Sequence, residues 1–365
     1  MGFDGGARRR DPGAARPIGR VRGLLLAQLR TTVAGSWWPR PELQDELRRY
    51  HAGELEDDAA EAVLRTAAQS AIDEQRELGL TEWTGGEYFT YEFIEHMQRM
   101  LTGITIQVPG KPVLFDYDDM AFARIDGDID APNGLGYVDA YVREKELAGG
   151  VPKATVVGPV EVAISTVGEL DGLKGQMPNL VRIVNAEMRG LADAGCPHVQ
   201  LDVPAFTTLI TNGAMTADEA ARIIAECFEG VEDTTRGVHL CSGNLRGRPL
   251  AGNLTSQPWL DILERLDGVV DVAHLALQYF NRYLERELFS GLPSSMELAA
   301  GIVDEACYWV EPVEKIRERA RDWAGVVGEE RLWLSLSCGF GRHPARSIPV
   351  LREKVENMVE AAGTL

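Results

Sequence analysis

Eight short apolar segments, each closed by a turn or a polar residue, alternate with helical stretches along most of the chain. Runs of this length are typical of strands buried on both faces, and their alternation with helices predicts a parallel sheet. Eight such units predict a single-domain α/β fold, a (β/α)8 TIM barrel. The predicted strands are Leu29–Ala34, Leu80–Trp83, Ala154–Val157, Val199–Leu201, Gly237–Leu240, Val272–Leu277, Gly301–Val303 and Leu332–Leu336.

The helices between these strands carry apolar residues at spacings of three and four. Thr216-Ala-Asp-Glu219 has the spacing of a capping box, which marks the start of one of them. The interval 88–153 is too long for one crossover, so we predict a helix at Tyr91–Leu101 and then an insertion over the barrel mouth, after the second strand. The other predicted helices are Asp57–Leu78, Met177–Ala194, Thr216–Glu229 and Pro312–Ala324.

The amino terminus differs in composition from the rest of the chain. Residues 1–40 contain eight Arg and two Asp, and residues 1–20 lack apolar periodicity. We therefore expect a flexible basic tail over 1–22 and one barrel domain over 23–365. The apolar stretch at 23–28 is too short for a secretory signal, so none is expected.

Charge and cysteine content narrow the classes of partner. The chain has 37 Lys and Arg against 56 Asp and Glu, and a net charge of −19 argues against a nucleic-acid partner. No apolar run approaches the roughly 20 residues needed to cross a bilayer. Five Cys are too few for a disulfide framework, and the odd count favours a reducing, cytoplasmic location. Small molecules are the expected partners.

Polar residues stand where the predicted strands end. In a barrel, the carboxyl ends of the strands form one rim, and the active site lies there. We therefore expect residues from distant parts of the sequence to meet at this rim. They are Ser36, Glu87, Asp202, His239, Cys241, Gln278, Asp304 and Cys338.

Within this set, His239-Leu-Cys241 places an imidazole and a thiol two residues apart at a strand end, so both point to the same side. Cys338 follows the last predicted strand. One imidazole and two thiolates are three of the four ligands of a tetrahedral zinc site, and catalytic sites keep the fourth position open. The alternative is that the two Cys are small buried residues and His239 is a core histidine. The remaining cysteines fall on helices or connections and are expected to be structural: Cys196, Cys227 and Cys307.

Six short motifs follow one another between about residues 30 and 360. They are Thr31-Thr-Val-Ala-Gly-Ser-Trp-Trp-Pro-Arg40, Gly86-Glu87, Gly158-Pro159-Val160, Gln200-Leu-Asp-Val-Pro-Ala205, His239-Leu-Cys241 and Arg331-Leu-Trp-Leu-Ser-Leu-Ser-Cys338-Gly339. In this order they resemble the catalytic barrel of cobalamin-independent methionine synthase. The chain is similar to the compact single-barrel members, which include the zinc-dependent epoxyalkane:coenzyme M transferases.

The resemblance implies a role for each matching residue. Those that match zinc ligands are His239, Cys241 and Cys338. Glu87 and Asp202 match the carboxylates that hold the amino group of homocysteine, and Ser36 matches a residue that contacts its carboxylate. The implied cofactor is therefore Zn²⁺, and the implied partners are a small-molecule thiol and an electrophilic alkyl donor.

The chain departs from the family pattern at three places. Gln278 stands where the family has a Glu as its fourth protein ligand, and a neutral amide binds zinc more weakly than a carboxylate. The aromatic residue that the long synthases use to stack folate is missing from Glu161–Thr166. Val203 follows Asp202, where the synthases have Glu. These departures leave the identity of the methyl donor and of the thiol open.

The soft ligand set fits activation of a thiol. A free thiol with a pKa of about 8.5 is mostly protonated at neutral pH, and only the thiolate is a competent nucleophile. Zinc removes the proton from a sulfur that it binds. We therefore expect transfer of a methyl or other alkyl carbon to a metal-bound substrate thiolate. The predicted catalytic residues are Gln278, Tyr279 and His343.

Two alternatives remain open. In the first, the thiolate opens an epoxide, which needs an acid to protonate the alkoxide. The candidate acids are Tyr88, Tyr279, Tyr283 and His343. In the second, the barrel binds a metal or ligand without catalysis, as Gln278 would favour. Arg282 and Arg286 lie four apart on a predicted helix, where a solvated face is a simpler interpretation than an anion site.

An acidic segment lies between residues 116 and 130. Its spacing does not match a known calcium loop, so we expect a solvated loop there.

Overall fold

The computed structural model describes residues 28–90, 93–107, 122–164, 166–167, 170–241, 256–279, 282–283, 286–340 and 348–363. The predicted basic tail, residues 1–22, and the candidate acid His343 lie outside these ranges. None of the helices within them combines the length and the apolar composition that a membrane span requires.

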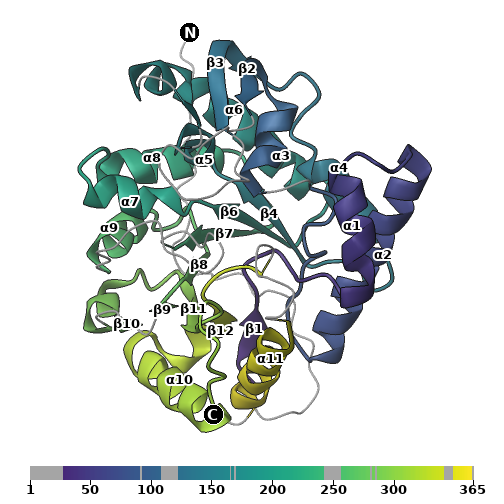
Figure 1. Cartoon of the computed structure of the whole chain (residues 1–365). Coiled ribbons are helices and arrows are strands. Elements are labelled where there is room, and N and C mark those ends of the chain that lie inside the picture. The colour runs from purple at the N-terminus through teal and green to yellow at the C-terminus, as the bar shows by residue number, and fades with distance from the viewer. Residues whose placement is uncertain are drawn as a thin grey trace, which may run out of the picture.

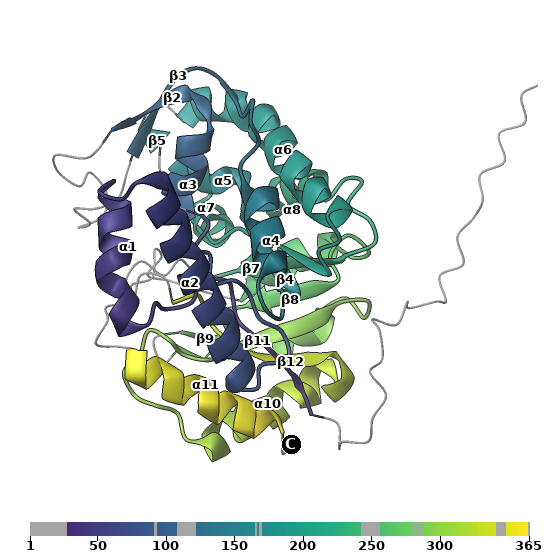
Figure 2. The same ribbon diagram turned by 90° about the vertical axis from the view of Figure 1, so that its right-hand side faces the viewer.

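Seven parallel strands form one curled sheet in the order β1-β12-β11-β8-β7-β6-β4 (Figure 1). Parallel neighbours need long crossovers, and helices supply them around the sheet (Figure 2). The strands are β1 (Arg30–Thr32), β4 (Lys153–Val157), β6 (His198–Asp202), β7 (Thr235–Leu240), β8 (Val272–Leu275), β11 (Glu297–Val303) and β12 (Leu332–Leu336).

The predicted capping box is confirmed: Thr216 Oγ1 accepts the Glu219 N–H at 3.2 Å, and Glu219 Oε2 accepts the Thr216 N–H at 2.8 Å. The α-helices are α1 (Gln44–His51), α2 (Asp57–Glu77), α3 (Phe93–Met100), α4 (Tyr137–Glu146), α5 (Pro159–Ile164), α6 (Leu170–Asp193), α7 (Ala205–Thr211), α8 (Ala217–Cys227), α9 (Gln257–Arg265), α10 (Val313–Val327) and α11 (Ile348–Ala362). Short 3-10 helices are η1 (Pro41–Leu43), η2 (Arg286–Gly291) and η3 (Glu329–Arg331).

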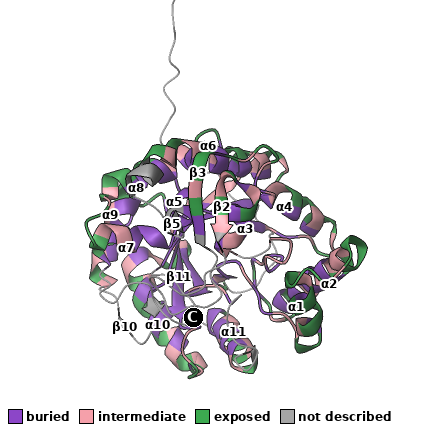
Figure 3. Cartoon of the chain, turned by 45° about the horizontal axis from the view of Figure 1, so that its top comes forward, coloured by how far each residue is buried: buried purple, intermediate pink, exposed green. Residues whose placement is uncertain are grey.

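The main core lies between the sheet and its helices. Alternate residues of the strands point outward to the helices, and these are apolar and fully buried, as Val156, Leu201, Val238 and Leu334 illustrate. Figure 3 shows this arrangement, with buried strands inside a ring of helices whose outer faces are exposed. These outward positions account for the apolar residues of the predicted strands, whereas the intervening inward positions are buried but mostly polar, as His198, Gln200 and Ser335 illustrate.

The predicted second strand, Leu80–Trp83, is wrong, and the described sheet therefore has seven strands and is not closed by an eighth. This segment does run beside β1, where the Glu82 N–H donates to Thr31 O at 3.0 Å. The next contacts use side chains, because Thr81 Oγ1 accepts the Thr31 N–H at 2.7 Å and Thr31 Oγ1 accepts the Thr81 N–H at 3.0 Å. Hydroxyl groups thus replace the regular backbone ladder between the segment and β1.

The insertion contains α3, α4, β2 (Thr102–Gln107) and β3 (Phe122–Asp130). Its two strands form a small sheet in the order β2-β3-β5 with β5 (Thr166–Val167), which comes later in the chain, after α5. The acidic segment was predicted to be a loop, and this is wrong for its second half. Asp126 and Asp130 lie on β3, where Arg124 and Arg182 pair with them at 2.7 Å. The part of the acidic segment before β3 lies outside the described residues.

The inward face of the sheet is polar. Where β4 and β6 begin, four buried side chains form what we call the floor network: Thr32, Glu82, Lys153 and His198. Lys153 Nζ donates to Val33 O at 2.6 Å, and the two Glu82 oxygens bind His198 Nδ1 at 2.8 Å and Thr32 Oγ1 at 2.6 Å. Burial alone would raise the pKa of Glu82, but His198 and Lys153 overcome this and lower it to about 2. The floor network therefore neutralises its own charge.

Candidate metal centre and carboxyl cluster

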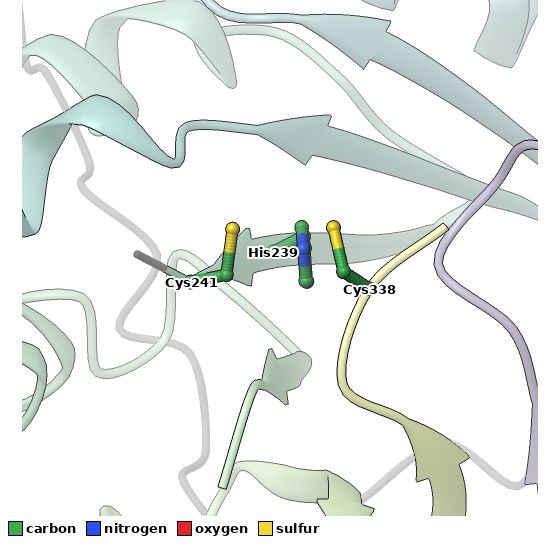
Figure 4. Close-up of side chains that lie close together, drawn as sticks. All are labelled: His239, Cys241 and Cys338. Carbon is green, nitrogen blue, oxygen red and sulfur yellow. The ribbon is translucent and has the colours of Figure 1, made fainter. Parts of the chain in front are cut away.

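Two strand ends bring an imidazole and two thiols together. His239 lies on the inward face of β7, Cys241 follows two residues later, and Cys338 follows the end of β12. Their ligand atoms all lie within 4.8 Å of one another. Figure 4 shows the three side chains, with the His239 ring between the two sulfurs in this view. The alternation of a strand explains why 239 and 241 share one side.

The surroundings of His239 leave one ring nitrogen available. His239 Nδ1 donates to the carbonyl oxygen of His274 at 3.2 Å, and such a bond fixes the tautomer in which Nε2 carries the lone pair. Nε2 is buried and has no hydrogen-bond partner among the described residues. A buried imidazole nitrogen in this condition, next to two sulfurs, is the arrangement that a metal ligand requires.

The Cys338 sulfur also needs a nearby cation before it can ionise readily. A hydrogen bond with Cys241, together with burial, raises the pKa of the Cys338 thiol well above its usual range. A divalent ion reverses this effect, because a coordinating thiol loses its proton. Among common divalent ions, zinc suits one nitrogen and two soft sulfur donors.

A carboxylate that the sequence analysis did not consider supports Cys338. Glu305 is buried, and its Oε2 accepts the backbone N–H of Cys338 at 3.0 Å. Its neighbour Asp304, a predicted rim residue, holds the turn after β11 instead, because its Oδ1 accepts the Ala306 N–H at 3.0 Å. The sequence signal for Glu305 was its place in the Asp304-Glu305 pair at a strand end, but the sequence analysis predicted only Asp304 as a rim residue.

The predicted substrate carboxylates lie at the same end of the sheet. Glu87 Oε1 accepts a hydrogen bond from Thr155 Oγ1 at 2.7 Å, and Asp202 Oδ1 accepts one from Gln200 Nε2 at 2.7 Å. Burial and the Asp202 charge raise the pKa of Glu87 to about 7. Burial raises the pKa of Asp202 as well, against the opposing effect of His239. Burial therefore opposes the ionisation of both carboxyls, and a positively charged ligand would favour it.

The backbone is adapted to these side chains. Glu87 has φ +65°, one of two non-glycine residues with positive φ among the described residues. Gly35 faces the Glu87 carboxylate so closely that a Cβ there would collide with Oε1. Gly339, next to Cys338, is in the same relation to Ser36 Oγ, which brings the third predicted substrate residue beside the metal-binding segment.

Two further buried carboxyls extend this group, and we call the four together the carboxyl cluster: Glu87, Glu144, Glu161 and Asp202. Burial, with a contribution from Glu87, raises the pKa of Glu144 to about 8. Burial also raises the pKa of Glu161 to about 8, although the Ala205 N–H that it accepts opposes this. Glu144 lies in the predicted insertion on α4, where nothing in the sequence sets it apart from a solvated helix residue.

The remaining candidates contribute less. Gln278 and Tyr279 form β9 (Gln278–Tyr279), which pairs with β10 (Arg282–Tyr283), and their side chains, like those of Arg282 and Tyr283, lie outside the described part of the structure. The Tyr88 hydroxyl donates to Trp37 O at 3.1 Å, which is a structural role. Arg286 forms an ion pair with Asp322 at the surface.

Comparison with known proteins places this site in a family. The model of the catalytic domain of cobalamin-independent synthase matches residues 29–364. A 5-methyltetrahydropteroyltriglutamate–homocysteine methyltransferase of Nitratidesulfovibrio vulgaris is 27% identical over 97% of this chain, and the match spans only 44% of that relative. A methionine synthase of Sulfolobus acidocaldarius is 25% identical over 92% of this chain and 91% of its own length.

A solved structure agrees in fold. A B12-independent methionine synthase from Shewanella sp. W3-18-1, in complex with selenomethionine, superposes with a TM-score of 0.72 over 92% of this chain and 97% of that one, at 19% identity. A putative vitamin-B12 independent methionine synthase from Listeria monocytogenes gives 0.68 at 18% identity. The chain, by its family-model match over 29–364, belongs to the catalytic-domain family of the cobalamin-independent synthases.

Proposed function

We propose that this chain is a zinc-dependent methyltransferase that activates a small-molecule thiol and transfers a methyl group to its sulfur. The observation that carries the proposal is the cluster of His239, Cys241 and Cys338, whose ligand atoms lie within 4.8 Å of one another at two strand ends. These three side chains would hold the ion. When bound, zinc supplies the positive charge that keeps the substrate sulfur deprotonated at neutral pH.

The residues of the chain then position the reaction. The sulfur would attack the methyl carbon of the donor, and the donor would leave with the electron pair of its bond to that carbon and take up a proton from water. The thiol proton would pass to water when the substrate binds. Glu87 and Asp202 would bind the substrate ammonium, and Ser36 its carboxylate. His274 orients His239 through the 3.2 Å bond to Nδ1.

The chemistry of the carboxyl cluster favours a thiol that also carries an amino group. A bound ammonium would stabilise the ionised form of carboxyls whose pKa is raised, whereas the sulfonate of coenzyme M would oppose their ionisation. The names of the Nitratidesulfovibrio and Sulfolobus relatives point to homocysteine or methionine, and the Shewanella structure holds selenomethionine. Homocysteine is therefore the substrate that we propose, with the methyl donor left open because the chain spans less than half of the relative whose name includes a folate.

The test combines metal analysis with turnover. The wild-type chain is expected to bind about one zinc per chain and to methylate homocysteine. Cys241→Ser and Cys338→Ser should lose most of the zinc, and activity should fall at least about 100-fold. Cys307→Ser is the matched control, because Cys307 is half-buried near the same rim and outside the cluster.

Three results would overturn the proposal. One is a Cys338→Ser variant that turns over at the wild-type rate without zinc. Another is consumption of an epoxide with coenzyme M and no methylation, which would establish ring opening. The third is a zinc-loaded wild-type chain without any turnover, which would establish a binding barrel.

A further inference from the structure

Cys338 differs from His239 in the way the chain holds it. His239 lies within β7, which pairs with β6 on one side and with β8 on the other. Cys338 comes two residues after Leu336, the last residue of β12 and the last one that pairs with β11. Figure 4 shows Cys338 on the stretch beyond the β12 arrow, with its side chain beside the His239 ring in this view. The position of this sulfur therefore depends on bonds outside the ladder of the sheet.

The side chain of Glu305 supplies one of these bonds. Glu305 comes two residues after the end of the neighbouring strand β11, it is 2% exposed, and its Oε2 accepts the Cys338 N–H at 3.0 Å. On either side of Cys338, the Ser337 N–H donates to Val303 O at 3.0 Å and the Phe340 N–H donates to a backbone oxygen at 3.2 Å. The carboxylate thus holds the backbone of the ligand residue itself, between two backbone anchors.

The turn that carries Glu305 is fixed by buried charges. The Asp304 N–H donates to Glu311 Oε1 at 3.0 Å. Glu311 is buried, and its two oxygens accept Lys354 Nζ of α11 at 2.5 Å and Arg319 Nη1 of α10 at 3.4 Å. A buried pair of this kind is costly to break, because removal of one partner leaves the other charge isolated. The turn therefore has little freedom to move away from Cys338.

The end of β11 is adapted to the same arrangement. Its register with β12 shifts between Gly301 and Val303, so Ile302 is an extra residue in β11. Ile302 O accepts Arg319 Nη1 at 2.7 Å, which satisfies the carbonyl of the extra residue. Irregularities of this kind are common beside active sites, where they change the direction of a side chain. The Arg319 guanidinium thus joins the irregular strand end to the turn that carries Glu305.

We propose that Glu305 is a positioning residue of the metal centre, whose carboxylate holds the Cys338 backbone so that the sulfur lies beside His239 and Cys241 before the ion binds. This rests on the proposed function, to which the ligand role of Cys338 belongs. A ligand that is already in place needs less ordering when the metal binds, so zinc binds more tightly. Loss of a group that orients a metal ligand typically costs about 10- to 100-fold in metal affinity.

The test compares side chains with and without an acceptor at position 305. Zinc dissociation constants are measured by chelator competition on the wild type and on Glu305→Gln, Glu305→Leu and Glu305→Ala. We expect the Leu and Ala variants to bind zinc about 10- to 100-fold more weakly. Glu305→Gln should stay within about threefold of the wild type, because its amide oxygen still accepts the N–H. The Leu and Ala variants differ in volume, so failure of one to fold leaves the other as the test.

A matched control separates positioning from general stability. Glu187 is also buried, and it accepts the Leu135 N–H at 2.5 Å and the Val138 N–H at 3.1 Å, away from the metal centre. Glu187→Leu should lower the melting temperature, as Glu305→Leu does, but leave the zinc dissociation constant within about threefold of the wild type. With cobalt in place of zinc, only the Leu and Ala variants at 305 should show a weaker sulfur-to-cobalt charge-transfer band.

The outcomes separate this inference from the proposed function. Wild-type zinc affinity in Glu305→Leu or Glu305→Ala would overturn the role of Glu305 while the zinc centre itself stands. Equal weakening in Glu305→Gln and Glu305→Leu would exclude the hydrogen bond as the cause, and equal weakening in Glu187→Leu would reduce the effect to lost stability. A wild-type chain that binds no zinc would remove the proposed function itself.

Discussion

The same strands contribute to both ends of the sheet interior, but the charges are balanced at one end and are all carboxyls at the other. β4 contributes Lys153 to the floor network and Thr155 to the carboxyl cluster, and β6 contributes His198 to one and Asp202 to the other. In the floor network Glu82 is neutralised within the chain, and its pKa lies at about 2. In the carboxyl cluster the pKa of Glu87 rises to about 7, and those of Glu144 and Glu161 rise to about 8.

The difference separates stability from binding. A buried ion pair that is complete holds the fold, since removal of either partner leaves an isolated charge. A group of carboxyls without matching cations destabilises the fold slightly and creates affinity for a positively charged ligand. The two regions lie within one strand length of each other, so variants in each provide a direct comparison.

Loss of the floor cation should give the largest effect. Lys153→Met leaves Glu82 buried without its ammonium neighbour, and we expect the free energy of unfolding to fall by about 3–5 kcal/mol in urea denaturation. Lys315→Met, which breaks a surface pair with Glu318, should cost less than about 1 kcal/mol. Equal losses in the two variants would remove the distinction between floor and surface.

Low pH should destabilise the protein through the same floor network. Because the pKa of Glu82 is lowered from 4.5 to about 2, its contribution of about 3 kcal/mol is complete above pH 4.5 and is lost as the pH falls toward 2. Glu82→Gln should lack this loss and be less stable than the wild type at pH 7. Urea unfolding at pH 2, 4 and 7 measures the free energy of unfolding of both proteins. If it fell equally with pH in the wild type and in Glu82→Gln, the pairing of Glu82 with His198 and Lys153 would be contradicted.

A charge removed from the carboxyl cluster should instead affect ligand binding. Asp202→Asn is expected to weaken the binding of homocysteine by about 2–3 kcal/mol, roughly 30- to 150-fold in the dissociation constant. The free energy of unfolding should be unchanged or higher. Calorimetry and urea denaturation measure the two quantities on one preparation. A variant that unfolds as readily as Lys153→Met would show that Asp202 has a structural role like that of the floor.

The smallest expected effect is the pH dependence of ammonium binding. A carboxyl with a raised pKa keeps its proton to higher pH, so Glu87 becomes ionised only as the pH rises through about 7. Methionine, which carries no thiol, should bind about tenfold more tightly at pH 8 than at pH 6, or about 1.4 kcal/mol. Glu87→Gln should give a flat profile, and a flat profile in the wild type would exclude this role for Glu87.

Much of the sheet follows from local sequence. In β7 and β12 the outward residues Val238 and Leu334 are apolar because they pack on helices, and strand alternation was enough to pair His239 with Cys241. Leu80–Trp83 also has apolar residues at its ends, yet its contacts with β1 use the hydroxyls of Thr31 and Thr81, which no hydrophobic pattern reveals.

The buried polar groups at the two ends of the sheet interior were harder to predict from the sequence. Lys153 and His198 stand at the starts of apolar runs, where a polar residue usually marks a solvated strand end. Their burial results from tertiary neighbours on other strands and on the segment around Glu82. Glu144 belongs to a helix of the insertion, and only the way in which that helix packs brings its carboxyl against Gly85, two residues before Glu87.

Glu87 adopts a backbone conformation that is unfavourable for a residue with a side chain. Its left-handed backbone is one that glycine would adopt without strain, as its neighbour Gly86 does at φ +80°. Replacement of Glu87 by glycine would relieve about 1–2 kcal/mol of torsional energy and, on the proposed function, would weaken binding of the substrate ammonium. A stability-guided redesign that relaxes every unfavourable torsion would therefore erase this carboxylate first.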